Sequence, residues 1–392
     1  MVHRGATSSS VPLWLYVIVM LATGSMNTIL NKWQDMQCVR DCESDHPKHF
    51  EQPVWQTLTM FVGESGCLAV FLLAQYLQKQ RLPEEAPLID AEEQDEDNQE
   101  QPVELKGISL LLLWLPTICD LLATSLMNVG LLFVAASVYQ MLRGSVVLFT
   151  GTFSTLFLGR KHPPYRWFAL CTVFVGVSLV GASSIFNKKP ELSFLQAISA
   201  SPSVEPTNSQ ALLGVALVVL AQSLTATQFV IEEKVLSKYK VNALKAVGLE
   251  GLFGLLTGLI VLPPVYYFYG QYQGPDNFFN VVQGFEEVFY VKSVFYIGIG
   301  ICFSISLFNW SGLSVTQTVS ATSRSTIDTC RTVFIWAISM SLGWETFKWL
   351  QVAGFIVLIY GTFVFNDVVA LPVWTGLGRA EDSEVVVEDD EL

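Results

Sequence analysis

Residues 108–133 read ISLLLLWLPTICDLLATSLMNVGLLF, an apolar run in which Asp120 is the one charged residue. A transmembrane α-helix needs about 20 consecutive, mostly apolar residues, because the hydrocarbon core of a bilayer is about 30 Å thick. This segment meets that requirement. We therefore predict that it crosses a membrane as a helix.

Nine further segments have the same character. Hydrophobic residues make up 51% of the 392 residues, charged residues make up 15%, and the mean hydropathy is +0.44. A water-soluble protein of this composition would expose more apolar surface than its core needs. We predict an all-α membrane protein with ten transmembrane helices, near residues 11–33, 53–77, 108–133, 137–158, 166–186, 211–231, 247–270, 292–314, 319–342 and 347–366.

Lysine and arginine residues in the connecting segments indicate the orientation, because short cytosolic loops are enriched in both. With the amino terminus in the cytosol, the cytosolic segments hold twelve of these residues and the opposite segments hold seven. The net charge of -13 comes largely from an acidic loop and an acidic tail, and no basic face is available to bind nucleic acid. We expect residues 1–10, 79–107 and 369–392 in the cytosol, and residues 34–52, 187–210 and 271–291 in the lumen.

The two halves of this arrangement contain matching segments. Ser125-Leu-Met-Asn128 in the third span corresponds to Ser306-Leu-Phe-Asn309 in the eighth, and glycines flank both Glu64 in the second span and Glu250 in the seventh. Because each half has an odd number of spans, the halves must be inverted relative to each other. We predict two inverted five-helix repeats at residues 11–186 and 211–368, joined by the luminal linker at 187–210.

Two further stretches carry a family resemblance. They are Gln140-Met-Leu-Arg-Gly144 in the fourth span and RTVFIWAISMSLGWE at residues 331–345. Together with the ten-helix architecture they resemble the drug/metabolite transporter superfamily, most closely the F branch of solute carrier family 35, member-six type. The resemblance covers residues 11–368 and implies a cavity between the halves, with the fourth and ninth spans near its centre. Nucleotide sugars are the best-known substrates of that family, and no motif in this sequence fixes a substrate.

Seven acidic or basic residues are embedded in the predicted spans, at least three residues from either end. A charged side chain at the centre of a transmembrane helix costs about 2.5–3.5 kcal/mol, so each residue should face a partner or a water-filled cavity. The seven are Glu64, Asp120, Arg143, Glu250, Arg324, Asp328 and Arg331.

The charges of the ninth span allow two interpretations. Asp328 lies four residues after Arg324 and three before Arg331, so it shares a helix face with both arginines. In one interpretation the three residues form a local ion-pair set. In the other, Asp328 neutralises one arginine while the second binds an anionic group of a substrate through its forked guanidinium.

Arg143 in the fourth span has the same two alternatives, structural pairing with Asp120 or contact with a substrate. Tyr139 and Gln140 lie one helical turn earlier and are also candidate substrate contacts.

Two carboxylates and two amides complete the candidate site. Glu64 and Glu250 occupy nearly equivalent places in the two halves, which suits either a proton-coupling role or a structural hydrogen bond to a neighbouring helix. Asn128 and Asn309 are candidates for lining the cavity, with interhelical contacts as the alternative.

Cys38 and Cys42 lie in the first luminal segment, close to His46 and His49. The favoured interpretation is a luminal disulfide, with free cysteines second and a metal site third, because the spacing is not that of a standard zinc motif.

The acidic loop contains a sorting pattern, an acidic residue followed after three positions by two aliphatic ones, at Glu84, Leu88 and Ile89. It resembles signals that clathrin adaptor complexes bind in cytosolic loops. We therefore expect a lysosomal or late endosomal membrane, with the Golgi and mitochondria as alternatives.

These features favour a secondary transporter that moves a small organic solute, with an anionic group as a candidate feature, by alternating access. The sequence has no Walker-type phosphate loop for an ATP-driven pump and no catalytic arrangement, so we expect neither an enzyme nor a cofactor or metal. A membrane scaffold or regulator that retains the fold is the main rival. A channel is disfavoured because no pore-lining motif repeats.

Overall fold

The computed structural model describes residues 12–369, except 44–46, 82–102, 106, 132, 135, 187–207, 269, 273–279 and 344–347. The predicted features that lie wholly or mostly outside the described residues are the amino-terminal segment 1–10, His46, the acidic loop 79–107 with its sorting pattern at 84–89, the linker at 187–210 and the tail at 369–392.

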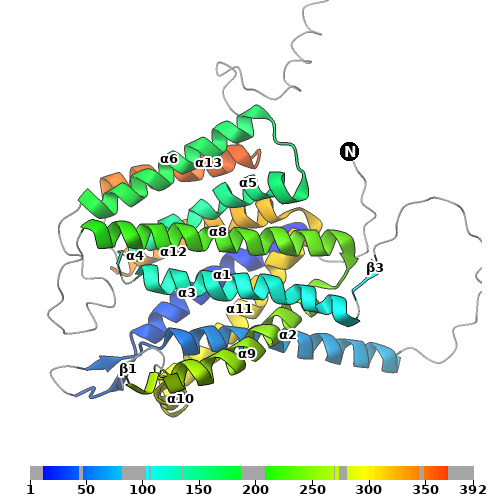
Figure 1. Ribbon diagram of the computed structural model, residues 1–392, viewed down its shortest axis with the longest axis vertical. Helices are drawn as coiled ribbons and strands as arrows, with labels where there is room; N and C mark the ends of the chain where they lie inside the picture. Colours follow the sequence, from blue (N-terminus) through cyan, green and yellow to red (C-terminus); the bar gives the residue numbers. More distant parts are fainter. Residues whose placement is uncertain are drawn as a thin grey trace, which may run out of the picture.

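Long helices dominate the fold, and a helix occupies each of the ten predicted spans (Figure 1). The first five spans correspond to α1 (Leu13–Asp35), α2 (Pro53–Arg81), the 3-10 helix η1 (Gly107–Leu113) with α3 (Trp114–Leu131), α4 (Ala136–Leu142) with α5 (Val146–Leu158), and α6 (Pro164–Phe186). The last five correspond to α8 (Asn208–Lys238), α9 (Ala243–Phe268), α11 (Lys292–Thr318), α12 (Ala321–Ser341) and α13 (Trp349–Phe365). The prediction of an all-α architecture is confirmed.

Among the described residues, eight segments are long and apolar enough to cross a membrane. The two predicted spans outside this set are α12 and α13. Helix α12 carries Arg324, Asp328 and Arg331, all of which are buried between other helices, so it does not need an apolar sequence to be stable in the bundle. Helix α13 has 17 residues, which span about 25 Å at 1.5 Å per residue.

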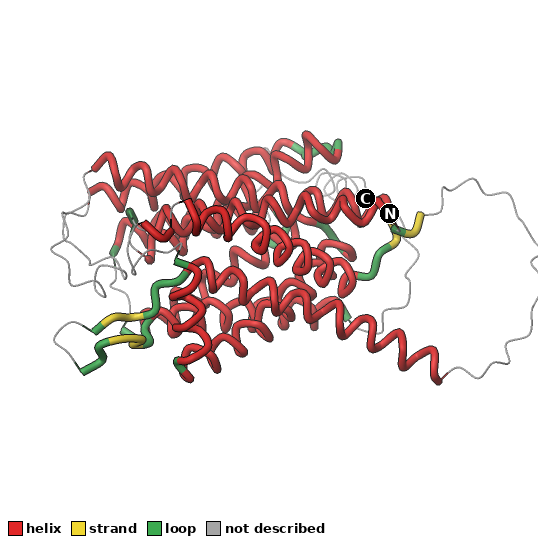
Figure 2. Tube along the Cα trace, turned by 60° about the horizontal axis from the view of Figure 1, so that its bottom comes forward, coloured by secondary structure: helices red, strands yellow, loops and turns green. Residues whose placement is uncertain are grey.

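Short elements cover the two ends of the bundle. Strands β1 (Cys38–Arg40) and β2 (Lys48–His49) form a hairpin at one end, and β3 (Val103–Glu104) pairs with β4 (Tyr239–Lys240) at the other (Figure 2). The helix α10 (Val281–Tyr290) and the 3-10 helix η3 (Gly270–Tyr272) were not predicted, because they are shorter than a membrane span. The described parts of two segments predicted to be luminal, 34–52 and 271–291, thus lie at the end that carries the hairpin.

The hairpin end is tied together by covalent and polar contacts. Cys38 and Cys42 form a disulfide. Arg40 of β1 makes an ion pair of 3.0 Å with Glu287 of α10, and the ring of Trp55 on α2 lies 5.8 Å from that of Phe285 on α10.

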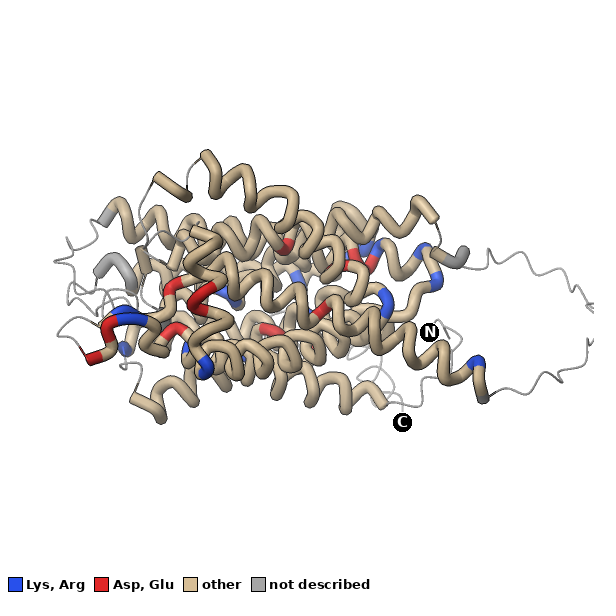
Figure 3. Tube along the Cα trace, turned by 90° about the horizontal axis from the view of Figure 1, so that it is seen from below, with Lys and Arg blue, Asp and Glu red and all other residues tan. Residues whose placement is uncertain are grey.

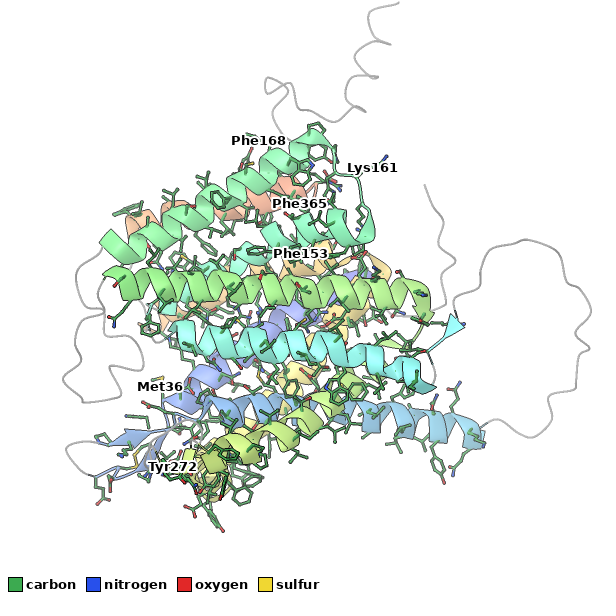
Figure 4. The ribbon with its side chains drawn as sticks, in the orientation of Figure 1. Met36, Phe153, Lys161, Phe168, Tyr272 and Phe365 are labelled. Atoms are coloured by element: carbon green, nitrogen blue, oxygen red, sulfur yellow. A yellow bond between two sulfur atoms is a disulfide. The ribbon has the colours of Figure 1, made fainter. Side chains whose placement is uncertain are left out.

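Four pairs of helices make the most extensive contacts: α1 with α11, α2 with α9, α3 with α8, and α6 with α13. Each pair joins one helix from the first half of the chain to one from the second. Helix α12 packs against α1, α5 and the turn between α4 and α5. Where α5, α6 and α13 meet, Phe365 is fully buried in an apolar cluster that includes Leu170, and Phe153 packs against this cluster (Figure 4).

A glycine permits the close approach of α2 and α11. A Cβ atom at Gly63 would lie 2.5 Å from the carbonyl oxygen of Cys302 and 2.7 Å from its Cα atom, and this backbone cannot move aside without shifting α11. Gly66, one turn later on α2, would place a Cβ in open space. Of the two glycines that flank Glu64, one is therefore required by packing.

We predict that Gly63→Ala destabilises the protein by about 1–3 kcal/mol through overpacking. Gly66→Ala is the matched control, and it should be neutral or stabilise the helix by up to about 1 kcal/mol, the propensity difference between the two residues. The measurement is the melting temperature of each purified variant in detergent. Equal melting temperatures for the two variants would show that α2 and α11 do not pack as described.

Candidate functional site

The bundle contains a cavity of about 270 Å³, which we call the central cavity, lined by residues of α1, α2, α3, α4, α8, α11, α12 and the turn after α4. It contains all seven predicted substrate contacts: Asn128, Tyr139, Gln140, Arg143, Asn309, Arg324 and Arg331. Glu64, Asp120 and Asp328 also line it. The structure thus brings together ten residues that are separated by up to 267 positions in the sequence (Glu64 to Arg331).

The predicted fourth span is broken in the middle. Helix α4 ends at Leu142, the 3-10 turn η2 covers Arg143–Ser145, and α5 begins at Val146. Short 3-10 stretches within a helix often mark functional hinges, and transporter sites are commonly built at interrupted helices. Arg143 is the first residue of this turn and faces the central cavity.

Arg324 has protein partners on several sides. Its Nη1 atom makes an ion pair with Glu232 of α8, and its guanidinium carbon lies 4.1 Å from the ring centre of Phe229. The Arg324 and Glu232 side chains are only 3% and 1% exposed, so this is a buried pair. One interpretation of the sequence was an ion-pair set of Arg324, Asp328 and Arg331 on one helix face. In the structure Arg324 is not part of such a set, because it pairs with Glu232.

Arg331 is held by Asp328 on its own helix. Its Nη2 atom lies 2.7 Å from the Asp328 carboxylate, its Nη1 atom donates to the Gly24 carbonyl at 3.1 Å, and its guanidinium lies over the ring of Phe308. The i,i+3 spacing of Asp328 and Arg331 therefore corresponds to a contact, whereas the i,i+4 spacing to Arg324 does not.

Arg143 and Asp120 differ from these pairs. Each side chain is partly exposed, and each lines the central cavity. Neither makes an ion pair or a side-chain hydrogen bond with any residue that the structure describes. The direct Asp120–Arg143 pair, one of the two alternatives for Arg143, is not formed here.

Glu64 and Glu250 lie at adjoining positions in the bundle. Glu64 is 5% exposed, and its Oε1 atom accepts a hydrogen bond of 2.5 Å from Nδ2 of Asn309. Glu250 is absent from the wall of the central cavity. It lines a smaller cavity of about 10 Å³, together with Glu64, Asp120, Asn309 and Arg324, and its Oε1 atom is buried without a partner among the described residues.

Several polar residues of the site were not predicted. Glu232 follows directly after the predicted sixth span at 211–231, and extending that helix by one turn would have included it. Gln228 donates a 3.0 Å hydrogen bond to Glu232, while Gln56 donates one of 2.6 Å to Asp35. Gln228, Gln56 and Asp35 line the central cavity. An uncharged glutamine in an apolar run gives little signal, so these residues needed the tertiary structure to be found.

The central cavity extends toward the hairpin end of the bundle. Its α1 residues lie in the second half of that helix, from Asn27 to Asp35, and its α2 residues lie in the first half, from Pro53 to Glu64. Both stretches adjoin the hairpin end, where Figure 4 places Met36.

A polar network links several elements at the opposite end of the bundle. Glu233 of α8 makes an ion pair with Arg160 and accepts a 2.8 Å hydrogen bond from the backbone N–H of Ala321, and Gln317 donates to the carbonyl of Val241 at 3.0 Å. Nearby, burial and the guanidinium of Arg166 lower the pKa of His162 below its usual range. Figure 4 places Lys161 at this end, and Figure 3 shows charged residues at both ends with a few inside the bundle.

Comparison with known proteins identifies the family. No family model matches the chain. Solute carrier family 35 member F6 of Homo sapiens is 35% identical over 378 residues, which cover 95% of this chain and 92% of that protein. Its Rattus norvegicus counterpart is 36% identical over 353 residues, 89% of this chain and 87% of that protein. An uncharacterized protein of Schizosaccharomyces pombe is 35% identical over 363 residues, 92% of this chain and 99% of that protein.

A solved crystal structure with 10% sequence identity superimposes with a TM-score of 0.50, over 89% of this chain and 94% of that one, which indicates a shared fold alone. Identity of 35% along nearly the whole chain is the stronger finding. The chain is a multi-pass membrane protein and belongs to solute carrier family 35, as a relative of member F6.

Proposed function

We propose that this protein is a secondary transporter that moves a small organic solute across an endolysosomal membrane by alternating access. The observation that carries the proposal is the central cavity: a space of about 270 Å³ inside a helical bundle, lined by charged and polar side chains that lipid would not tolerate. Membership of a solute carrier family supports transport over enzymatic activity.

The helix contacts support a pair of inverted repeats at 11–186 and 211–368. If the two halves are equivalent, each span corresponds to the span five places away, so α1 corresponds to α8 and α3 to α11. Exchanging the halves then converts the α1–α11 contact into an α8–α3 contact, which is also present. The same operation turns the α2–α9 and α6–α13 contacts into themselves. A two-fold axis between the halves accounts for this pattern, and rocking of the halves about such an axis is a common mechanism of alternating access.

The two ends of the bundle differ in the way this mechanism requires. The central cavity reaches toward the hairpin end. At the other end, the Arg160–Glu233 pair ties α8 to the segment after α5, and the Glu233–Ala321 hydrogen bond ties α8 to the start of α12. We infer a conformation that is open toward the lumen and closed toward the cytosol. The membrane scaffold is disfavoured because it has no need of a polar cavity, and a channel is disfavoured because one end is closed.

Transport is tested with the purified protein in liposomes. The liposomes are incubated with a metabolite extract from cells, washed, and their contents are measured by mass spectrometry against protein-free liposomes. We expect enrichment of at least one small solute in the protein-containing liposomes. Contents identical to those of the protein-free liposomes, for protein shown to be folded, would favour the scaffold.

The endolysosomal location rests on the pattern at Glu84, Leu88 and Ile89 and on a cytosolic position of the 79–107 loop. Adaptor complexes could bind the pattern only on that side of the membrane. Replacing Leu88 and Ile89 with alanine should shift the protein to the cell surface or the Golgi without loss of stability, which fluorescence microscopy with organelle markers measures. Unchanged lysosomal residence of the double variant, or mitochondrial residence of the wild type, would contradict the proposal.

Proton coupling through Glu64 and Glu250 is a second element of the proposal. Both carboxylates adjoin the same small cavity, and Glu64 also faces the central cavity, where a solute would bind. A carboxylate in this place can exchange a proton with the cavity as the solute enters or leaves.

A further inference from the structure

We propose that the central cavity binds a small zwitterionic solute, in which a carboxylate contacts Arg143 and an ammonium group contacts Asp120. This inference rests on the proposed transport function and adds the class of substrate. It follows from the way in which charges are paired, and left unpaired, around the cavity.

The arginines of the cavity are not equivalent. Arg324 is paired with Glu232, and Arg331 is paired with Asp328. Their guanidinium groups are further covered by the rings of Phe229 and Phe308. Arg143 makes no such contact with any described residue, so its forked donor groups are available to a carboxylate of the solute.

Asp120 provides the complementary charge. It lines the same cavity on α3 and, like Arg143, has no ion-pair or hydrogen-bond partner among the residues that the structure describes. Two opposite charges that share one cavity without touching each other leave a space that a solute with both charges can bridge. Since an unpaired charge in the membrane is costly, a bridging solute would stabilise both side chains.

A buried acceptor lies close to this pair of charges. The Oε1 atom of Gln140 is buried and has no hydrogen-bond partner in the described part of the chain, and Gln140 lines the cavity one turn before Arg143. Buried polar atoms are nearly always hydrogen-bonded, so an unsatisfied acceptor at the cavity wall indicates a missing donor. An ammonium group supplies up to three N–H donors.

Size and charge both argue against a nucleotide sugar. The volume of about 270 Å³ lies just below the range of about 300–1,000 Å³ in which drug-sized ligands bind. A pyrophosphate would bring at least two negative charges, whereas the cavity offers one arginine, Arg143, that is not already paired among the described residues. A solute the size of a free amino acid fits both observations.

The inference is tested by thermal stability of the purified full-length protein with a panel of probes. The panel holds the twenty standard amino acids, glycine betaine and UDP-glucose, and each zwitterion that stabilises the protein is compared with its two single-charge analogues, one without the ammonium group and one without the carboxylate. For leucine these are 4-methylpentanoate and 3-methylbutylamine. We expect at least one zwitterion to raise the melting temperature, and its two single-charge analogues to have no effect at the same concentration. Stronger stabilisation by UDP-glucose or by a single-charge analogue, or no stabilisation by any zwitterion, would overturn the proposal.

Two variants test which side chain binds which charged group of the solute. Arg143→Gln and Asp120→Asn should each weaken binding of the zwitterion by about tenfold or more, since each removes a charged hydrogen bond. Arg143→Gln should leave a site that accepts the amine, and Asp120→Asn one that accepts the carboxylate analogue. Lys161→Gln and Glu43→Gln, exposed residues outside the cavity, are the matched controls. Zwitterion binding unchanged in both cavity variants would contradict the assignment.

The liposome experiment separates this inference from the proposed function. Enrichment only of solutes that carry charges of a single sign would support the transport function and contradict the zwitterionic substrate class. If the liposomes enrich no solute, either from the cell extract or from the panel of zwitterions, the result would contradict both the transport function and the zwitterionic substrate class.

Discussion

Arg324→Ala is expected to reduce the amount of folded protein by a factor of ten or more. The substitution would leave the Glu232 carboxylate charged and buried without its partner, which typically costs about 3–5 kcal/mol. That cost is comparable to the whole stability of many proteins, about 5–15 kcal/mol. Abundance of the monodisperse protein after detergent extraction, measured by fluorescence-detected size-exclusion chromatography, provides the test.

The structure offers a matched control in the same cavity. Arg143→Ala removes the same type of side chain, but Arg143 has no ion-pair partner among the described residues, so abundance should stay close to that of the wild type. Adding Glu232→Gln to Arg324→Ala should restore much of the lost protein, because no unpaired carboxylate would then remain. Equal abundance of Arg324→Ala and Arg143→Ala would mean that the Arg324–Glu232 pair does not stabilise the fold.

Glu64→Gln should abolish the concentrative uptake of solute that a pH gradient drives. With one proton coupled to each solute molecule, a gradient of one pH unit supports about tenfold accumulation, since a factor of ten corresponds to about 1.4 kcal/mol. Glutamine keeps the size of glutamate and its carbonyl oxygen still accepts from Asn309, but it cannot release a proton. Accumulation should therefore fall to the external concentration, while exchange of labelled for unlabelled solute continues.

The measurement is uptake by proteoliposomes, with and without a pH gradient, of a solute identified by the extract experiment. Glu250→Gln tests the second carboxylate in the same way, and Glu43→Gln is an exposed control. Wild-type accumulation in both the Glu64→Gln and Glu250→Gln variants would exclude these residues from proton coupling. Loss of exchange as well as accumulation in Glu64→Gln would instead indicate a structural or substrate-binding role.

The two arginines of α12 show how far the spacing of residues along a helix can predict ion pairs. Asp328 lies within reach of both Arg324 and Arg331 by periodicity, and helix geometry alone cannot decide between them. The structure pairs Asp328 with Arg331 at 2.7 Å, because Glu232 approaches Arg324 from α8. An ion pair between residues 92 positions apart depends on how two helices pack, and no local pattern encodes it.

The sequence by itself determined the class of the fold and the candidate residues of the cavity. Apolar segments of about 20 residues must cross the membrane as helices, because a bilayer offers no partner for the backbone, and charges inside such segments must face one another or a cavity. Those two constraints are local, so they can be read from consecutive residues such as 108–133. Tertiary structure alone decided which charges are paired and which are available. In the sequence, Arg143 and Arg324 look alike, because each is an arginine inside an apolar span. Only the packing of α8 against α12 gives Arg324 a carboxylate partner, Glu232, whereas Arg143 faces the cavity.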